Sequence, residues 1–304
     1  MSRPPRLAPV VVALLAGLGL AACSTGTPPT AAPAAPPEEQ VEVLASFYPL
    51  QYVAEQVGGD AVAVSNLTPP GADGHDVELT PSQVARLGEV DLVVHLSGGL
   101  QPATDDALEV VPPAALVDAA DVVDLAPTRG SDGAADPHFW LDPLLLADLG
   151  DRVAATLGQV DPDRTRDWDW RAADLRARLE TLDVELTEAL APCDGAALVV
   201  SHEAFGYLAD RHGIEQVGLT GIDPEVPPTP ARLRRAVEVV EGRDVGTVFF
   251  ERSAGPRVTE ALADDLGLAT GVLDPLEQHP GAGEDYESVM RANLVALTDG
   301  LSCG

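Results

Sequence analysis

The stretch "DPDRTRDWDWRAADLRARLETLDVELTEAL" (161–190) contains no glycine, and no proline after Pro162. Its apolar residues recur at gaps of 7, 4, 3, 4 and 4, which is the stripe of an amphipathic helix. The stripe consists of Trp168, Leu175, Leu179, Leu182, Leu186 and Leu190. At ~1.5 Å per residue such a helix is ~45 Å long. That length exceeds the usual helix of a compact domain, so we expect a strut between two lobes.

Short apolar runs alternate with helical patterns on both sides of this segment, as in parallel βα units. The predicted strands cover 41–46, 61–67, 91–97, 115–120, 196–201, 214–220, 247–251 and 269–274. The predicted helices cover 49–58, 80–89, 203–213, 229–242, 255–267 and 284–300. The expected fold is therefore α/β: two βα lobes with central parallel sheets, 41–160 and 192–304, joined by one long rigid helix over 161–191.

The N-terminus has the pattern of an export signal. Arg3 and Arg6 precede the apolar run 7–22, which at ~16 residues is shorter than the ~20 of a membrane span. "LAAC" (20–23) resembles a bacterial lipobox, with 1–23 as signal peptide and Cys23 as the lipidated residue; an ordinary signal with a chance cysteine is the alternative. The Pro/Ala/Thr-rich segment 24–40 is typical of a flexible tether. We expect an exported protein, lipid-anchored on the outer face of the cytoplasmic membrane, at the cell surface or in the periplasm.

The chain is strongly acidic, with 49 acidic residues against 18 basic ones and a formal net charge of −31 over 304 residues. Such a charge disfavours nucleic acid and anionic lipid surfaces as partners, and it attracts cations. We therefore expect no nucleic-acid partner. The expected state is a monomer.

Two further cysteines, Cys193 and Cys303, lie in the second half of the chain. They could be free buried thiols, but in an exported protein a pair more often forms a disulfide. We predict a bond that ties the C-terminus to the start of the second lobe.

Three of the six histidines follow predicted strands. His75 and His138 lie in the loops after 61–67 and 115–120, and His202 directly follows 196–201; Asp274 ends the strand 269–274. Ligands of open parallel sheets bind beyond the carboxyl ends of the strands. A single histidine is usually not a ligand, and "DP" at Asp274 also makes an ordinary turn. Their shared placement is what predicts a common site between the lobes.

Three imidazoles and one carboxylate form a tetrahedral set suited to Zn²⁺, whereas a site richer in carboxylate suits Mn²⁺. If the set is real, its imidazoles lie within about 8 Å of one another, a few metal–nitrogen bond lengths. Glu203, Asp76 and Glu251 are candidates, by position, for carboxylates that orient the rings. The other histidines, His95, His212 and His279, do not follow the strand-end rule; His279 lies in a loop near the expected site and could assist metal capture.

Four segments carry a resemblance to the metal-binding solute-binding proteins of zinc/manganese ABC transporters. They are "PPGADGHDVELTPSQ" (69–83), "DPHFWLDP" (136–143), "SHEAFGYLADRHGI" (201–214) and "GVLDPLE" (271–277). The resemblance covers nearly all of 41–304. It implies one metal between two lobes, ligands at His75, His138, His202 and Asp274, and delivery to an ABC permease. Manganese-type members carry glutamate where this chain has His202, so the resemblance favours zinc. The long His-rich loop of some zinc importers has no counterpart here.

The predicted function is capture and delivery of Zn²⁺, not catalysis. The alternative within the family is a manganese-binding protein. A zinc hydrolase is the main rival, with Glu203 as base, but "SHEAF" lacks the second histidine of an HExxH helix. Catalytic zinc also keeps an open position, whereas four protein ligands would leave none. A surface adhesin is a third hypothesis, which a partner-binding assay would test.

Overall fold

The computed structural model of the protein describes residues 40–72, 74–75, 77–125, 127, 135–251, 257–301 and 303. All of them belong to one compact unit, Glu39–Gly304. The predicted signal peptide, the lipidation site Cys23 and nearly all of the predicted tether lie outside the described residues.

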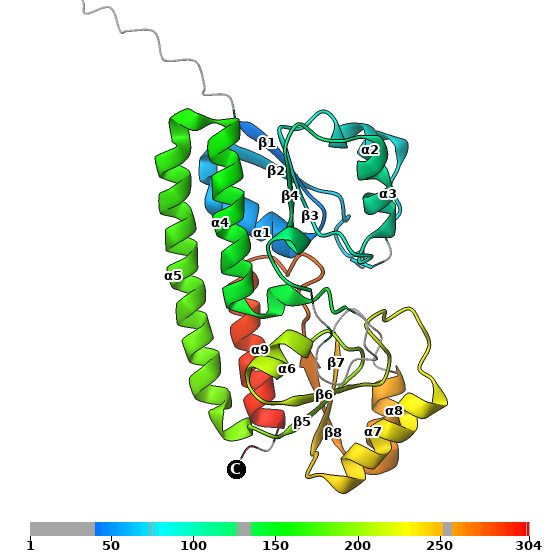
Figure 1. Cartoon of the computed structure of the whole chain (residues 1–304). Helices are drawn as coiled ribbons and strands as arrows, with labels where there is room; N and C mark the ends of the chain where they lie inside the picture. Colours follow the sequence, from blue (N-terminus) through cyan, green and yellow to red (C-terminus); the bar gives the residue numbers. More distant parts are fainter. Residues whose placement is uncertain are drawn as a thin grey trace, which may run out of the picture. The chain divides into compact units, whose positions relative to one another are not determined.

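The first sheet has four parallel strands in the order β2-β1-β3-β4 (Figure 1). These are β1 (Val41–Ala45), β2 (Val62–Asn66), β3 (Leu92–His95) and β4 (Leu116–Asp118). Its helices are α1 (Tyr48–Gly58), α2 (Pro81–Leu87) and α3 (Pro102–Val110). At the start of α2, Thr80 and Gln83 form a capping box with proline in the first turn, which fixes where this helix begins.

The second sheet repeats the topology, with parallel strands in the order β6-β5-β7-β8. These are β5 (Ala197–Val200), β6 (Glu215–Gly218), β7 (Thr247–Glu251) and β8 (Ala269–Leu273). Its helices are α6 (Gly206–Arg211), α7 (Pro230–Gly242), α8 (Arg257–Leu266) and α9 (Tyr286–Gly300). Every predicted strand is present, and the α/β class with two parallel sheets is confirmed.

The long central segment is a helical pair. The predicted helix over 161–190 begins with a short 3-10 turn, η4 (Pro162–Arg164), and continues as α5 (Thr165–Leu190). All six residues of its apolar stripe are buried. Before it lies α4 (Pro143–Val160), which the sequence analysis missed, as it missed α3. Figure 1 shows α4 and α5 side by side, with α5 running past both sheets. Because α5 packs on α1 and α4 and also on α9, it joins elements from both halves.

One apolar core extends through both halves. It includes Trp140, Trp168, Phe205 and Tyr286, each almost wholly buried. At the far end of α9, Cys193 and Cys303 form the predicted disulfide, which closes a span of 110 residues. The predicted covalent tie between the C-terminus and the start of the second half is therefore confirmed.

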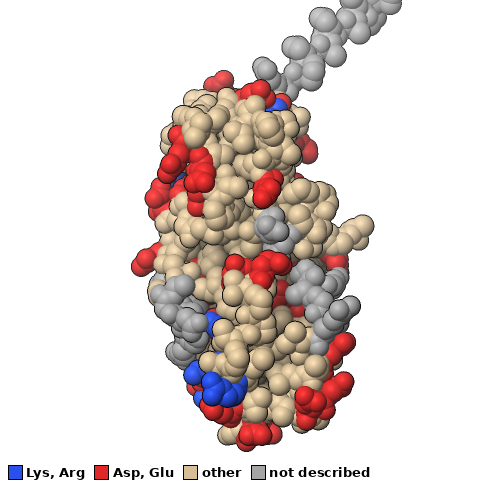
Figure 2. Space-filling model, turned by 90° about the vertical axis from the view of Figure 1, so that its right-hand side faces the viewer, with Lys and Arg blue, Asp and Glu red and all other residues tan. Residues whose placement is uncertain are grey.

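Acidic side chains outnumber basic ones on the face shown in Figure 2. Figure 2 shows Asp and Glu spread over one face, with basic side chains gathered towards one end. Within the described ranges, none of the helices has the length and apolarity needed to cross a membrane.

Candidate metal centre

Four side chains from four loops converge between the two sheets. His75 lies after β2 and His138 after β4, while His202 follows β5 and Glu277 follows β8. Among the described residues, these four form the group of histidines and acids that could hold a metal ion, with ligand atoms within 4.8 Å of one another. The carboxyl ends of parallel strands thus place the site, as they do in other open α/β sheets.

The three imidazole rings satisfy the distance expected from the sequence. Ring centroids lie 5.4 Å apart for His75 and His138, 5.3 Å for His138 and His202, and 6.1 Å for His75 and His202. His138 and His202 are buried, and the side chain of His75 is 9% exposed. The ring of His138 packs against Trp140 and also faces the other two imidazoles.

Four of the six separations among the donor atoms are close to the edges of a tetrahedron, and all six lie within 4.8 Å. Oε1 of Glu277 lies 3.1 Å from Nε2 of His138, 3.4 Å from Nε2 of His202 and 3.5 Å from Nε2 of His75. The Nε2 atoms of His75 and His138 are 3.3 Å apart. Zinc–ligand bonds of about 2.0–2.1 Å in tetrahedral geometry require edges of about 3.3 Å. The three separations from Glu277 and the one between His75 and His138 therefore suit one small tetrahedral cation.

Asp136 orients the ring of His138. Its Oδ1 lies 2.7 Å from Nδ1 of His138 and also accepts the backbone N–H of the same residue at 2.9 Å. Asp136 is fully buried. The backbone N–H and Nδ1 of His138 both donate to this oxygen, which fixes the ring and directs Nε2 at the other members of the group. The sequence analysis missed this residue, although it opens the motif that contains His138.

Glu251 orients the ring of His202 in the same way. Its Oε1 forms a short hydrogen bond with Nδ1 of His202 and accepts the hydroxyl of Ser201 at 2.8 Å. Glu251 ends β7, next to β5 in the sheet, so the strand order brings the carboxylate beside the ring. Glu251 was one of three carboxylates selected by position, and it does contact a ligand ring.

The acids determine how the cluster is charged. Burial lowers the pKa of His138, but hydrogen bonds to Asp136 and Glu277 outweigh it and raise the pKa. Burial likewise opposes the charge of His202, yet Glu251 and then Glu277 raise its pKa well above the ordinary value. Burial would raise the pKa of Glu277, but its hydrogen bonds to the imidazoles bring it well below its usual range. These shifts favour the charged forms of His138, His202 and Glu277 when no metal is bound.

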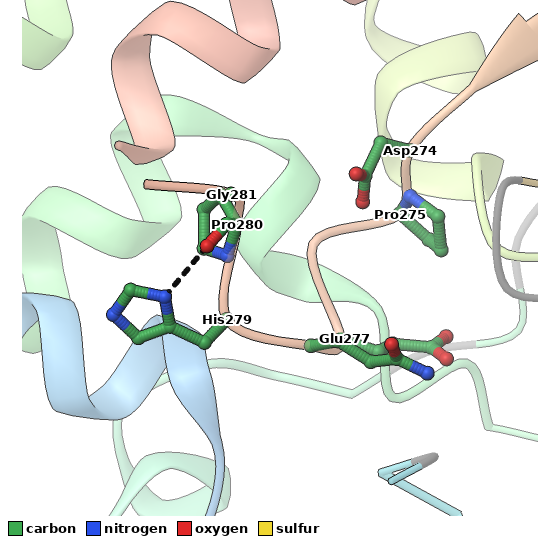
Figure 3. Close-up of a pocket in the computed structure, with 7 residues that line it drawn as sticks. Asp274, Pro275, Glu277, His279, Pro280 and Gly281 are labelled. Carbon is green, nitrogen blue, oxygen red and sulfur yellow. Dashed lines mark hydrogen bonds between the residues drawn. The ribbon is translucent and has the colours of Figure 1, made fainter. Parts of the chain in front are cut away.

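Asp274 is not the fourth member of the group, which corrects the expectation from the sequence. Its Oδ1 accepts the backbone N–H of Leu276 at 2.8 Å, so the carboxylate closes its own turn. That turn carries the chain to Glu277, three residues further on. Figure 3 shows both acids on the loop, with the ring of His279 on the other side of it from the Glu277 carboxylate. The strand-end rule found the right loop and selected the wrong acid.

The remaining candidates have other surroundings. Glu203 pairs with Arg232 at 2.6 Å, and Asp76 lies outside the described residues. His279 packs against the ring of Tyr48, with centroids 4.9 Å apart. Its Nδ1 lies 2.8 Å from the carbonyl oxygen of Pro280.

His95 and His212 lie outside the group. Nε2 of His95 is 3.2 Å from Asp105, and burial lowers the pKa of His95. Burial also lowers the pKa of His212, at the end of α6. Neither contributes to the four-ligand group, as the strand-end rule predicts.

Two parallel sheets with a buried set of three imidazoles and a carboxylate between them define a two-lobed metal-binding protein. The sequence matches the family model described as "Zinc-uptake complex component A periplasmic" over residues 43–300. The chain therefore belongs to this family, and the resemblance noted in the sequence is confirmed.

Named relatives agree with this family. The chain is 28% identical over 306 residues to the zinc-binding lipoprotein AdcA of Streptococcus pneumoniae, covering 95% of this chain and 60% of that protein. It thus spans about three-fifths of the length of that relative. It is 28% identical to the high-affinity zinc uptake system protein ZnuA of Bacillus subtilis, covering 86% of this chain and 88% of that one.

Solved structures share the fold. The laminin-binding protein Lmb of Streptococcus agalactiae, described as a bifunctional protein with adhesin and metal-transporting activity, has a TM-score of 0.80 at 30% identity, covering 87% of this chain and 100% of that one. Zn(II)-bound AdcA from Streptococcus pneumoniae has a TM-score of 0.74 at 29% identity, covering 86% of this chain and 58% of that one.

Proposed function

We propose that this protein captures Zn²⁺ outside the cytoplasmic membrane and delivers it to an ABC permease for import. The observation that carries the proposal is the convergence of His75, His138, His202 and Glu277, whose ligand atoms lie within 4.8 Å of one another, with Oε1 of Glu277 at 3.1–3.5 Å from all three Nε2 atoms. Family membership and relatives named for zinc binding support the same cargo.

The four residues would bind the ion through one carboxylate, that of Glu277, and three neutral imidazole rings. On binding, Zn²⁺ displaces the protons stored on the imidazoles, and Glu277 supplies the negative charge. Asp136 and Glu251 keep the Nε2 atoms of His138 and His202 directed at the ion. Zinc is preferred over manganese because three of the four donors are imidazole nitrogens, whereas manganese favours a site richer in oxygen.

Transport, and not hydrolysis, is the activity that fits this arrangement. Four protein donors fill a tetrahedral zinc site, and a hydrolytic zinc needs an open position for water. Glu203, the only base considered for a hydrolase, is paired with Arg232. The proposed location is the outer face of the cytoplasmic membrane, with a lipid on Cys23 as anchor, and the proposed state is a monomer.

The test measures metal content and affinity. The protein, stripped with chelator, is titrated with Zn²⁺ and Mn²⁺ by calorimetry and by competition with a chromogenic chelator. We expect one Zn²⁺ per chain, bound more tightly than Mn²⁺, and much weaker zinc binding by His202→Ala and Glu277→Ala. Unchanged zinc affinity in both variants would reject the site, and tighter binding of Mn²⁺ would reject the cargo. Loss of zinc-dependent growth when Cys23 is replaced by Ala would support the anchor.

A further inference from the structure

The turn that leads to Glu277 has an uncommon backbone conformation. Leu276 has a φ of 62°, and among the described residues it is the one non-glycine residue with a positive φ. Its side chain is completely buried. The left-handed conformation is unfavourable for a residue with a branched apolar side chain, so surrounding contacts must hold it.

Asn293, on α9, clamps the residue at which this turn begins. Its Oδ1 accepts the backbone N–H of Asp274 at 2.9 Å, and its Nδ2 donates to the carbonyl oxygen of Asp274 at 2.7 Å. Asn293 is 3% exposed. One buried side chain therefore binds both backbone groups of Asp274 and holds that residue against the helix.

Two more hydrogen bonds continue the support along the turn. Nε1 of Trp140 donates to the carbonyl oxygen of Pro275 at 2.7 Å, and Oδ1 of Asp274 accepts the N–H of Leu276 at 2.8 Å. The three residues before Glu277 are thus each bound. Since the left-handed conformation of Leu276 is unfavourable, we expect the turn to relax when these bonds are lost, and Glu277 then to change direction.

We propose that Asp274 and Asn293 are positioning residues for Glu277. Asn293 holds Asp274, and the Asp274 carboxylate holds Leu276 in the left-handed conformation that directs Glu277 at the three imidazoles. This inference rests on the proposed function, in which Glu277 is the fourth ligand of Zn²⁺. Without the clamp, the turn relaxes, the ion keeps only its imidazole ligands, and zinc binds more weakly and dissociates faster.

Three variants test the clamp. Asn293→Ala removes both bonds to Asp274, and Asp274→Ala removes the acceptor for Leu276. We expect each to weaken zinc binding by roughly 10- to 100-fold, as for other residues that orient metal ligands. Asp274→Asn should bind nearly as tightly as the parent, because asparagine makes the same turn with its amide oxygen. If Asp274→Asn is as weak as Asp274→Ala, the carboxylate charge is what matters and the proposal is overturned.

The matched control is Thr298→Ala, on the same helix. The Thr298 hydroxyl donates to the carbonyl oxygens of Leu294 and Val295, which both belong to α9. We expect parent-like affinity. Melting temperatures of the metal-free proteins show whether each variant folds.

A double-mutant cycle distinguishes positioning from a general structural effect. In a Glu277→Ala background, Asn293→Ala should cause no further loss of zinc affinity, because the ligand it positions is gone. The d–d absorption of the Co²⁺-loaded protein reports the ligands around the metal. It should therefore change in the same way in Asn293→Ala and in Glu277→Ala, because both lose the Glu277 ligand. An equal loss with and without Glu277 overturns the proposal. If the parent does not bind zinc, the proposed function fails; if Glu277→Ala is weak while both clamp variants bind like the parent, only the clamp fails.

Discussion

Nε2 of His138 lies 3.1 Å from Oε1 of Glu277, although 139 positions separate the two residues in the chain. His138 follows β4 in the first sheet, and Glu277 follows β8 in the second. The contact therefore joins the two halves at the metal centre. Both residues are buried, so the negative charge of Glu277 acts on the imidazoles with little screening by water.

Zinc affinity is expected to fall as the pH is lowered. The pKa values of His138 and His202 are raised above their ordinary values, and Zn²⁺ binds only the unprotonated rings. As the pH falls, protons therefore begin to compete with Zn²⁺ for these rings while the pH is still above ~6.5, the ordinary pKa of histidine. Chelator competition between pH 5.5 and 8.5, with calorimetry in buffers of different ionisation enthalpy, measures affinity and proton release. An affinity independent of pH across this range would contradict the charge state described here.

The stability of the metal-free protein should show the opposite trend. Because the folded-state pKa values of His138 and His202 are raised, their stabilisation is complete below pH ~6.5 and is lost as the pH rises through those values. The pKa of Glu277 is lowered, so its stabilisation is present above pH ~4.3 and is lost as the pH falls through its folded value. The cluster thus stabilises the metal-free fold most between about pH 4.3 and 6.5. Thermal melts should show a larger rise on adding zinc at pH 8 than at pH 6.

Asp136→Asn should weaken zinc binding by about 10- to 100-fold. The amide keeps the shape of the side chain but removes the charge that fixes the ring of His138. Asp223→Asn is the control. Oδ1 of Asp223 accepts the backbone N–H of the residue two positions later, as Oδ1 of Asp136 does, but Asp223 is exposed. Competition titrations on both variants check the result; equal affinities would show that Asp136 does not act through His138.

His279→Ala should leave equilibrium zinc affinity unchanged. The ring contacts Tyr48 and the Pro280 carbonyl, and it is not a member of the four-ligand group. A titration under the same conditions as the parent suffices. A tenfold loss would show that His279 binds the ion, and stopped-flow mixing would reveal any separate effect on the rate of capture.

Removing the disulfide should lower stability but not zinc affinity. Closing a loop of this length contributes about 5 kcal/mol in the chain-entropy model. Cys193 precedes β5, at the end of the strand opposite His202, so the metal site does not depend directly on the bond. Urea unfolding and zinc titration of Cys193→Ser/Cys303→Ser, compared with the parent, measure the two quantities. A large loss of affinity in a folded double variant would contradict this separation.

Much of the fold could be predicted because its signals are local. The apolar runs placed all eight strands, and the leucine stripe of α5 placed the central helix. The helix α4 was not predicted; it follows the histidine motif 136–143 directly. Its start depends on Asp142, whose carboxylate accepts the N–H of Leu144.

The site could be predicted from the sequence only in part. The strand-end rule found His75, His138 and His202, since it depends only on position along each strand. It could not distinguish Asp274 from Glu277, because that choice depends on a turn closed by a side chain and on Asn293, 19 residues further along the chain. Asp136 lay within the quoted motif, but its contact with the ring depends on the conformation of the loop.

The Cys193–Cys303 bond also makes the second sheet, with α6 to α9, part of a covalent ring. A protease that cuts one exposed loop within this ring opens the ring without releasing a fragment. A nicked molecule therefore keeps both halves of its metal centre on one molecule until a reductant or a second cut separates them.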